Sequence, residues 1–328
     1  MAESRPPSYR ELMSLPYTNA PRWAVILAGG SGTRLHPLTR RLFGEDRPKQ
    51  FCKLFGDRTL LGDTQARIAR VIPAERTMCV VVKAHAPYYG QALAGVASSR
   101  VLVQPVGRGT TAAIAYSLAR IAAIDEHAIV GFFPADHHFA DEAAFTSAVD
   151  RAYSLAHSLT TVSGDKLLLL GAQPEHPEVE YGWIEPGGTI DGVLCKSVFH
   201  VKRFWEKPSL EIARGLLERG CLWNMFVMIG RVRTFLDMLK QSIPHVFRAF
   251  QAQAKHLGGI FDAAKVYNSL ASGDFSTQVL SALPDRLAVL RLDNVGWSDL
   301  GTPERVIAAV GASAGNRVAR FTTPLTAA

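Results

Sequence analysis

The chain has 328 residues, of which 48% are hydrophobic and 20% charged, and its formal net charge is +7. This length suits two average domains or one large α/β unit. The composition is that of an ordinary globular protein, which excludes a disordered, collagenous or disulfide-dense chain, and the positive charge favours anionic partners.

The first part of the chain alternates apolar strands with helical segments. Residues 1–22 contain prolines and mixed charges, and we expect them to form an N-terminal arm. Hydrophobic patterning after that arm predicts strands at 23–28, 78–82, 100–103 and 128–133 and helices at 61–71 and 110–123. Because strands separated by helices form parallel sheets, we expect an α/β fold with a doubly wound, Rossmann-like sheet.

The second part, beyond Asp165, has a different texture. Prolines and glycines interrupt strand-like runs, and the predicted elements are strands at 167–171, 181–184, 193–204, 222–229 and 287–292 and a helix at 209–218. Such runs extend the sheet with mixed pairing. We expect residues 23–310 to form one folded unit in two halves, and residues 311–328 to form a C-terminal tail.

The cysteines, the hydropathy and the basic residues of the sequence bear on its compartment and partners. The four cysteines lie far apart without a Cys-x-x-Cys pair, which fits a reducing cytoplasm: Cys52, Cys79, Cys195 and Cys221. No apolar run approaches the ~20 residues that span a bilayer. The basic residues come without a recognisable nucleic-acid-binding module. We therefore expect neither a membrane nor a nucleic acid as partner.

The strongest local motif is the glycine loop Leu27-Ala28-Gly29-Gly30-Ser31-Gly32-Thr33-Arg34-Leu35. Its glycines let backbone N–H groups approach a phosphate, and its arginine adds a charged fork for phosphate oxygens. The loop is neither a dinucleotide fingerprint, which needs a glycine in place of Leu35, nor a Walker loop, which needs Gly-Lys-Ser/Thr. A sharp strand-to-helix turn without a ligand is the alternative. Seven basic residues favour a phosphorylated ligand: Arg34, Arg40, Arg41, Arg47, Lys49, Lys53 and Arg58.

Three candidate sites follow predicted strands, namely the glycine loop, Gln104 and Asp136. Open parallel sheets bind ligands beyond the carboxyl ends of their strands, so these sites should converge. Pro48-Lys49-Gln50-Phe51 adds an ammonium group on a stretch that proline keeps out of regular helix.

The glycine loop followed by Pro-Lys resembles the signature of the sugar-nucleotide pyrophosphorylases, nucleotidyltransferases that act on sugar 1-phosphates. The resemblance extends from Trp23 to about Val310, and its closest version is similar to the mannose-1-phosphate guanylyltransferase family, in which Pro-Lys-Gln-Phe is typical. Further matching motifs are Gln104-Pro105-x-Gly107-Arg108, Pro134-x-Asp136-His137, Tyr181-Gly182, Phe204-x-Glu206-Lys207-Pro208, Leu222-Trp223-Asn224 and Trp297-Ser298-Asp299-Leu300-Gly301.

This resemblance implies an enzyme that transfers a guanylyl group from GTP to mannose 1-phosphate, giving GDP-mannose and pyrophosphate. The attack would be in-line and Mg²⁺-dependent, without a covalent intermediate. It also implies a nucleotidyltransferase-type mixed sheet with a nucleotide half up to about residue 165 and a sugar half after it. The chain would carry the guanylyltransferase unit without an appended isomerase domain. A homodimer is implied by relatives, although no residue pattern specifies an interface.

The family roles transfer residue by residue. Nucleotide binding is assigned to Gly29, Gly30, Gly32, Thr33, Arg34, Gln104 and Gly107, with Gln104 on the base edge. The catalytic group is assigned to Arg34, Lys49, Asp136, Lys207 and Asp299, of which Asp136 and Asp299 would share Mg²⁺. Sugar-phosphate binding is assigned to Tyr181, Gly182, Glu206, Lys207 and Asn224, with Lys207 on the phosphate.

Simpler interpretations exist for several of these residues. Asp136 could cap the helix that starts at Asp141-Glu142, and His137-His138 could suggest zinc, although no third ligand has suitable spacing nearby. Glu206-Lys207 could be a surface ion pair worth at most ~1 kcal/mol. Trp223 and Trp297 would then be core packing, with Trp297 helping to place Asp299.

Four segments depart from the family pattern, three of them in the sugar half. Arg108-Gly109-Thr110 replaces Arg-Asn-Thr, and Val179-Glu180-Tyr181-Gly182-Trp183 replaces Thr-Gly-Tyr-Gly-Tyr. The Ser-Gly that customarily follows Trp-Asn is absent, leaving Met225-Phe226 directly after Asn224. Phe275-Ser276-Thr277-Gln278-Val279 stands for Ser-Ile-Asp-Tyr-Ala.

These departures keep alternatives open. The chain could use another pair of nucleoside triphosphate and sugar 1-phosphate. It could also be a catalytically silent protein that senses sugar nucleotides, but such a protein should have lost a metal aspartate or a phosphate lysine. A nucleic-acid-binding protein, suggested by the isoelectric point alone, would show steeply salt-dependent DNA affinity with no effect of nucleotide.

Overall fold

The structure is a computed structural model that describes residues 20–193, 195–254 and 262–313. Most of the predicted N-terminal arm (1–22) and C-terminal tail (311–328) lies outside the described residues. Where these segments are described, Arg22 is already the first residue of the first strand, and the last helix continues to Ser313. In the described residues, no helix is both long and apolar enough to cross a bilayer.

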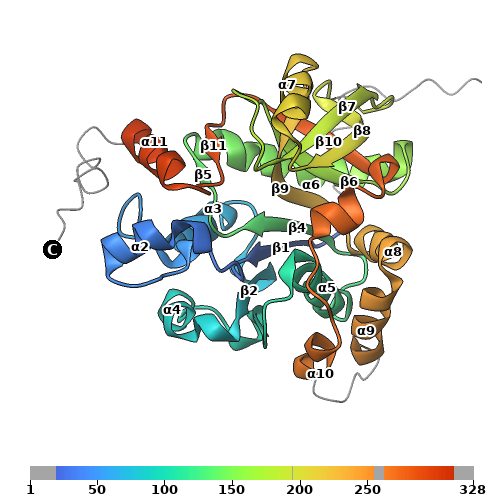
Figure 1. Ribbon diagram of the computed structural model, residues 1–328. Coiled ribbons are helices and arrows are strands. Elements are labelled where there is room, and N and C mark those ends of the chain that lie inside the picture. Colours follow the sequence, from blue (N-terminus) through green and yellow to red (C-terminus); the bar gives the residue numbers. More distant parts are fainter. Residues whose placement is uncertain (1–19, 194, 255–261, 314–328) are drawn as a thin grey trace, which may run out of the picture.

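A nine-stranded sheet forms the centre of the molecule (Figure 1), in the order β3-β2-β1-β4-β9-β6-β10-β8-β7. The strands are β1 (Arg22–Leu27), β2 (Thr77–Val82), β3 (Val101–Gln104), β4 (Ile129–Pro134), β6 (Leu167–Ala172), β7 (Gly182–Thr189), β8 (Val198–Glu206), β9 (Leu222–Arg231) and β10 (Leu287–Leu292). The first four in spatial order are parallel, whereas β9 runs antiparallel to both β4 and β6. The expected α/β fold with a mixed sheet is confirmed, and strands from both sides of Asp165 share one sheet.

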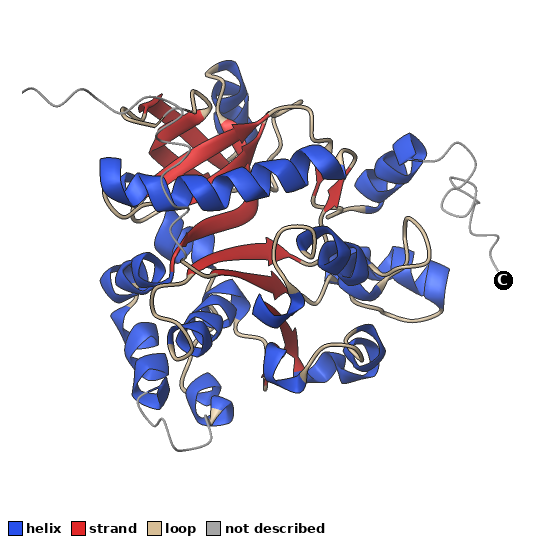
Figure 2. Cartoon of the chain, turned by 180° about the vertical axis from the view of Figure 1, so that it is seen from behind, coloured by secondary structure: helices blue, strands red, loops and turns tan. Residues whose placement is uncertain are grey.

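Helices cover both faces of this sheet. Core residues on one face belong to α5 (Gly109–Ala122), α8 (Val232–Ser242), α9 (Pro244–Ala254) and α10 (Ala263–Asn268). The other face packs against α3 (Leu60–Ile68), α6 (Glu142–Val162) and α7 (Leu210–Glu218). Figure 2 shows the long α6 lying across the sheet. In β1 the side chains alternate between the faces, with Trp23 and Val25 on the first and Ala24 on the second.

Smaller elements complete the fold around the sheet. They are α2 (His36–Phe43), α4 (Ala86–Ala92), α11 (Pro303–Ser313), the two short strands β5 (His138–Phe139) and β11 (Trp297–Ser298), and the π-helical segment η6 (Ser276–Leu280). One-turn 3₁₀ helices are η1 (Thr33–Leu35), η2 (Lys49–Phe51), η3 (Ala74–Arg76), η4 (Lys83–His85), η5 (Ser98–Arg100) and η7 (Pro284–Arg286). Leu35, Leu38, Val306 and Val310 share one apolar cluster, so α2 and α11 pack together.

Two predicted boundaries differ from the structure for local reasons. The helix predicted at 61–71 is α3, which ends at Ile68. The N–H of Val71 closes a tighter turn on the Ile68 carbonyl, and Pro73 disfavours a helical conformation at the residue before it. The strand predicted from residue 193 starts at Val198. A turn with Gly192 at φ 78° precedes it, and glycine adopts this left-handed conformation without strain.

Candidate active site

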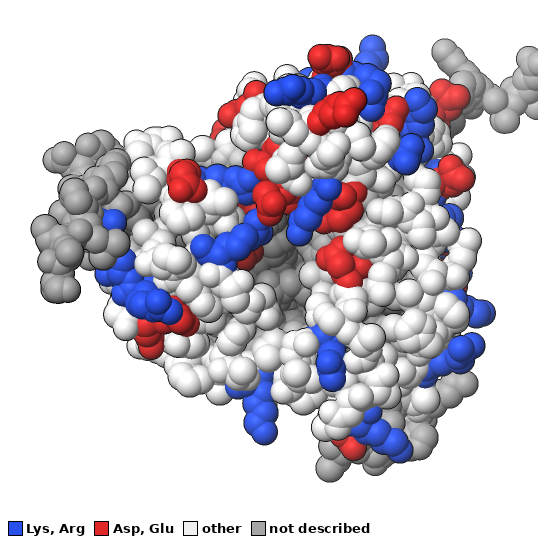
Figure 3. All heavy atoms as spheres, in the orientation of Figure 1, with Lys and Arg blue, Asp and Glu red and all other residues white. Residues whose placement is uncertain are grey.

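A pocket of about 330 Å³ lies at the carboxyl ends of β1, β3 and β4. Figure 3 shows a hollow near the centre of this face, with basic and acidic side chains along its upper rim. Ten of the predicted site residues line the pocket: Gly29, Gly30, Gln104, Gly107, Asp136, Tyr181, Gly182, Glu206, Asn224 and Asp299. Residues predicted from distant parts of the sequence therefore meet in one cavity.

The glycine loop is held in shape by the Pro-Lys-Gln-Phe segment. The buried Gln50 donates from Nε2 to the carbonyl of Ala28 at 2.9 Å and to that of Gly30 at 2.8 Å. Gly32 has φ 63°, and a Cβ there would lie 3.1 Å from the backbone nitrogen of Lys49. The two motifs are thus one packed unit, which explains why they occur together in the sequence.

Lys49 contacts both of the aspartates that are predicted to bind the metal. Its side chain is only 9% exposed, and its Nζ lies 3.3 Å from Asp136 Oδ2. The same Nζ donates to the main-chain carbonyl of Asp299. The pairing of β5 with β11, in which Ser298 lies opposite His138, brings the two aspartates to the same lysine.

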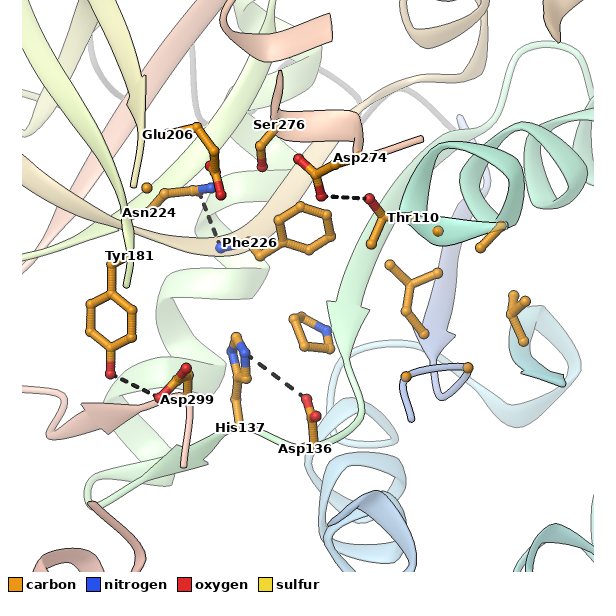
Figure 4. A pocket seen from close by; sticks show the side chains of 18 of the residues that line it. Thr110, Asp136, His137, Tyr181, Glu206, Asn224, Phe226, Asp274, Ser276 and Asp299 are labelled. Carbon is orange, nitrogen blue, oxygen red and sulfur yellow. Dashed lines mark hydrogen bonds and ion pairs between the residues drawn. The ribbon is translucent and has the colours of Figure 1, made fainter. Parts of the chain in front are cut away.

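Asp136 does not cap a helix, because Asp141 is the N-cap of α6 and accepts from the backbone N–H of Ala144 at 2.8 Å. The interpretation of Asp136 as a helix cap is therefore wrong. Asp136 remains directed at the pocket, as Figure 4 shows.

The carboxylate of Asp299 is held by three donors. Its Oδ1 accepts from the Tyr181 hydroxyl at 3.0 Å, the Gly301 backbone N–H at 2.8 Å and Arg305 Nη1 at 2.9 Å. Burial alone would raise the pKa of Asp299, but the charges of Lys49 and Arg305 outweigh it and hold the pKa below its usual value. Asp299 is therefore ionised at neutral pH.

Arg305 is a site residue that the sequence analysis missed. It comes from the first turn of α11, pairs with Glu178 as well as Asp299, and lies 4.5 Å from the centre of the Tyr181 ring. A cation in the first turn of a helix opposes the helix dipole. Arg305 lies in this unfavourable position six residues after Asp299. The position is a sequence signal that Arg305 has a specific acidic partner.

His137 is neutral and forms part of the wall. Its Nδ1 faces the indole N–H of Trp297 at 3.1 Å, so the ring proton belongs on Nε2, which lies 4.0 Å from Asp136 Oδ1. Burial lowers the pKa of His137 to about 4. Trp297, expected to be core packing, lines the pocket as well and places His137 beside Asp136.

Glu206 and Asn224, two of the residues predicted to bind the sugar phosphate, lie across the pocket from Asp136, whereas Tyr181, a third, lies beside Asp299 (Figure 4). The Asn224 side-chain oxygen accepts from the Phe226 N–H at 3.1 Å. Burial raises the pKa of Glu206 to about 7, with a further contribution from the negative charge of Asp274. The sequence analysis did not foresee that Phe226, Asp274 and Ser276 would line the same pocket.

The segment 273–278 reaches the pocket because it is bonded to the start of α5. The Gly273 N–H donates to the Arg108 carbonyl at 3.0 Å, and Thr110 Oγ1 donates to Asp274 Oδ2 at 3.1 Å. A Cβ on Gly109 would lie 2.1 Å from the Gly273 carbonyl oxygen. The Gly109 departure from the family pattern is therefore tied to the departure at 275–279.

Some predicted site residues lie outside the pocket wall. Arg34 forms an ion pair with Glu180 at the mouth, where both side chains are about half exposed. Lys207 is exposed, has φ 45°, and donates its backbone N–H to the Tyr181 carbonyl at 3.2 Å. Gly32 and Thr33 belong to the loop without lining the cavity. The roles of these residues stay predictions.

The donor set of the pocket fits a divalent cation such as Mg²⁺. This ion prefers oxygen and is usually held by one or two carboxylates with phosphate oxygens and water. Asp136 and Asp299 supply two carboxylates in one pocket. Across the described ranges, no cluster of three or more histidine, cysteine, aspartate or glutamate side chains could hold a metal by itself. Phosphate oxygens of a ligand would therefore have to complete the coordination.

Comparisons with known proteins identify the family of the chain. The profile of the family described as "Nucleotidyl transferase" matches residues 23–314. The mannose-1-phosphate guanylyltransferase ManC of Salmonella typhimurium is 31% identical over 290 residues, which are 85% of this chain and 58% of that protein. The xanthan biosynthesis protein XanB of Xanthomonas campestris pv. campestris (strain B100) is 33% identical over 287 residues, covering 85% and 57%.

The chain is also similar to a solved structure. A crystal structure from Thermus thermophilus, described as that of a mannose-1-phosphate geranyltransferase, superposes with a TM-score of 0.69 at 30% identity, covering 85% of this chain and 76% of the other. The chain spans less than three fifths of the curated relatives that it matches.

Proposed function

The chain belongs to the nucleotidyl transferase family, and from this premise we propose that it transfers a guanylyl group from GTP to mannose 1-phosphate. The products would be GDP-mannose and pyrophosphate. The observation that carries this proposal is the position of Lys49, which contacts both Asp136 and Asp299 at the edge of a glycine loop.

The proposed reaction needs no general base. A sugar 1-phosphate is already an anionic nucleophile at neutral pH, so the difficulty lies in bringing two polyanions together. One of its phosphate oxygens attacks the α-phosphorus of GTP. The new oxygen–phosphorus bond forms as the bond from the α-phosphorus to the bridging oxygen breaks, and pyrophosphate leaves with that electron pair.

The charge balance of the pocket supports a requirement for cations. Within the described chain, its wall carries five carboxylates and neither lysine nor arginine: Asp136, Glu180, Glu206, Asp274 and Asp299. Bound Mg²⁺, held by Asp136 and Asp299, would neutralise charge on the phosphates. Lys49 would act beside it, Arg34 would bind the triphosphate at the mouth, and the exposed Lys207 would meet the phosphate of the sugar.

Gln104 supports recognition of the base. It is 2% exposed, and its Oε1 accepts from the Tyr267 hydroxyl at 3.1 Å, which directs the amide NH₂ toward the side of Gly29. That NH₂ group would donate to an acceptor on the guanine edge. A base that leaves a buried donor unpaired can be rejected by a factor of up to ~10⁴.

We place this activity in the cytoplasm. All four cysteines are free thiols, and three of them are buried, which suits a reducing compartment. Transfer between another nucleoside triphosphate and another sugar 1-phosphate is the competing function, because the departures from the family pattern are mostly on the sugar side. A silent sensing protein is disfavoured by the intact cluster of Lys49, Asp136 and Asp299.

Pyrophosphate release with Mg²⁺, measured across four nucleoside triphosphates and several hexose 1-phosphates, tests the proposal. We expect the highest kcat/KM with GTP and mannose 1-phosphate. A higher value with another pair would replace the substrates and keep the reaction class. No release with any pair, from a folded protein, would contradict the proposed activity.

A further inference from the structure

Phe226 has a backbone conformation that is unusual for its residue type. Its φ is 53°, in the left-handed region that a bulky side chain rarely adopts. Strained backbone of this kind is concentrated at functional sites. In the family pattern Ser-Gly follows Trp-Asn, and here Met225-Phe226 directly follow Asn224. Without that glycine, the left-handed backbone conformation falls on Phe226.

A bulge in β9 directs this residue. In the pairing with β6, Leu169 lies opposite Met228 and Gly171 lies opposite Asn224. Three residues of β9, 225–227, therefore face one residue of β6. Met225 and Val227 are buried on the α6 side of the sheet, whereas Phe226 is only partly buried and lines the pocket.

Polar side chains surround Phe226 in the part of the pocket where we expect the sugar. Figure 4 shows its ring beside Asn224 and Thr110, with Glu206, Ser276 and Asp274 above it. Asn224 also accepts the Phe226 N–H, so the aromatic ring and the amide are fixed to each other. The base-directed Gln104 contacts Tyr267 instead, on a different part of the wall.

We propose that Phe226 is a specificity-determining residue for the sugar of the sugar 1-phosphate. Its ring supplies an apolar surface for the C–H face of a pyranose, while Asn224 and Glu206 accept or donate hydrogen bonds at the hydroxyls. A hexose with an axial hydroxyl on that face would place a polar group against the ring and bind more weakly. The inference rests on the proposed function, because it takes the pocket to hold a sugar 1-phosphate.

The test compares wild type with Phe226→Gly, Phe226→Leu and the control Asn294→Gly. Asn294 also has positive φ, 57°, but it is exposed and outside the pocket, so its replacement relieves strain without changing the wall. Binding of three hexose 1-phosphates and of GTP is measured by calorimetry, turnover is measured separately, and melting temperature reports on folding.

For Phe226→Gly we expect roughly 10-fold weaker binding of the preferred hexose 1-phosphate, the effect of a lost apolar contact. GTP affinity should change less than about twofold, because its contacts lie elsewhere. The melting temperature should stay within about 3 °C, because relief of strain offsets lost packing. Phe226→Leu should retain part of the sugar affinity, and Asn294→Gly should match wild type for both ligands.

Unchanged affinity of Phe226→Gly for the hexose 1-phosphate would overturn the inference. An equal loss of affinity for the hexose 1-phosphate and for GTP, together with a large fall in melting temperature, would also overturn it. So would a wild-type protein that binds no hexose 1-phosphate. A wild-type protein that binds the sugar phosphate without turnover would contradict the proposed function instead. In that case weaker binding by Phe226→Gly would still support the role of the ring.

Discussion

The ammonium nitrogen of Lys49 lies 3.3 Å from the carboxylate of Asp136, which lines a pocket whose wall, among the described residues, carries neither lysine nor arginine. The pair joins a loop that follows the glycine motif to a loop that follows β4. The proposed chemistry depends on this contact, since it sets one positive charge where two sets of phosphates would meet.

Replacement of Lys49 by methionine should remove a preorganised positive charge. We expect kcat/KM to fall by ~10²–10³, which corresponds to about 3 kcal/mol of transition-state stabilisation. Steady-state pyrophosphate release measures this loss. The exposed Lys83 serves as the control, and Lys83→Met should be as active as wild type. An equal loss in both variants would show that net charge, and not position, matters.

Replacement of Arg305 by alanine should loosen the Asp299 carboxylate. Arg305 is 17% exposed and pairs with both Asp299 and Glu178, so its loss leaves two partly buried carboxylates without their partner. We expect about 2 kcal/mol lower stability in urea unfolding and a clear fall in kcat. Arg305→Lys should recover part of both, and Arg151→Ala, on the exposed side of α6, should change neither. Wild-type turnover in Arg305→Ala would rule out a positioning role.

Glu180→Gln should release Arg34 for the triphosphate. Both partners are about half exposed, so the pair is worth at most ~1 kcal/mol and the KM for GTP should fall by up to about fivefold. The difference from wild type should shrink at high salt, because screening weakens exposed charge pairs. Glu126→Gln, an exposed replacement in the turn that follows α5, is the control. A higher KM for GTP in Glu180→Gln would show that Glu180 assists binding.

Glu206 predicts a pH dependence of stability. Burial raises its pKa to about 7 from an ordinary value of 4.5. The folded state therefore holds a proton that the unfolded state releases between these values, and this group lowers stability as pH rises from about 4.5 to 7. Glu206→Gln lacks this loss. The free energy of unfolding of Glu206→Gln minus that of wild type should therefore increase from about pH 4.5 to pH 7 and stay constant above pH 7. Urea unfolding at pH 5, 6, 7 and 8 measures the difference, and a pH-independent difference would contradict the raised pKa.

Motifs whose residues act within a few positions of each other could be predicted from the sequence. The glycine loop and the Pro-Lys-Gln-Phe segment each point to phosphate chemistry, and the strand pattern indicates that Gln104 and Asp136 share an edge of the sheet. Asp299 could be assigned only by family resemblance. What brings it to Asp136 is the pairing of two-residue strands β5 and β11, which are too short to leave a periodic signal.

Other features depend on tertiary contacts that local patterns do not encode. The role of Arg305 requires knowing that α11 packs beside Tyr181, and the ion pair of Arg34 with Glu180 links the two halves of the chain. Lys207 is exposed and has a φ of 45°, and the sequence Glu-Lys-Pro reveals neither. Phe226 could have been suspected from the missing Ser-Gly, but only the backbone shows the strain.

The most direct test of the account is the turnover of Asp136→Asn with GTP, mannose 1-phosphate and Mg²⁺. This replacement keeps the size of the side chain and removes the negative charge that faces Lys49. We expect kcat to fall by ~10²–10³ while the melting temperature stays close to wild type. Near-normal turnover by the folded variant would contradict the assignment of Asp136 and Asp299 as the carboxylates at the centre of the reaction.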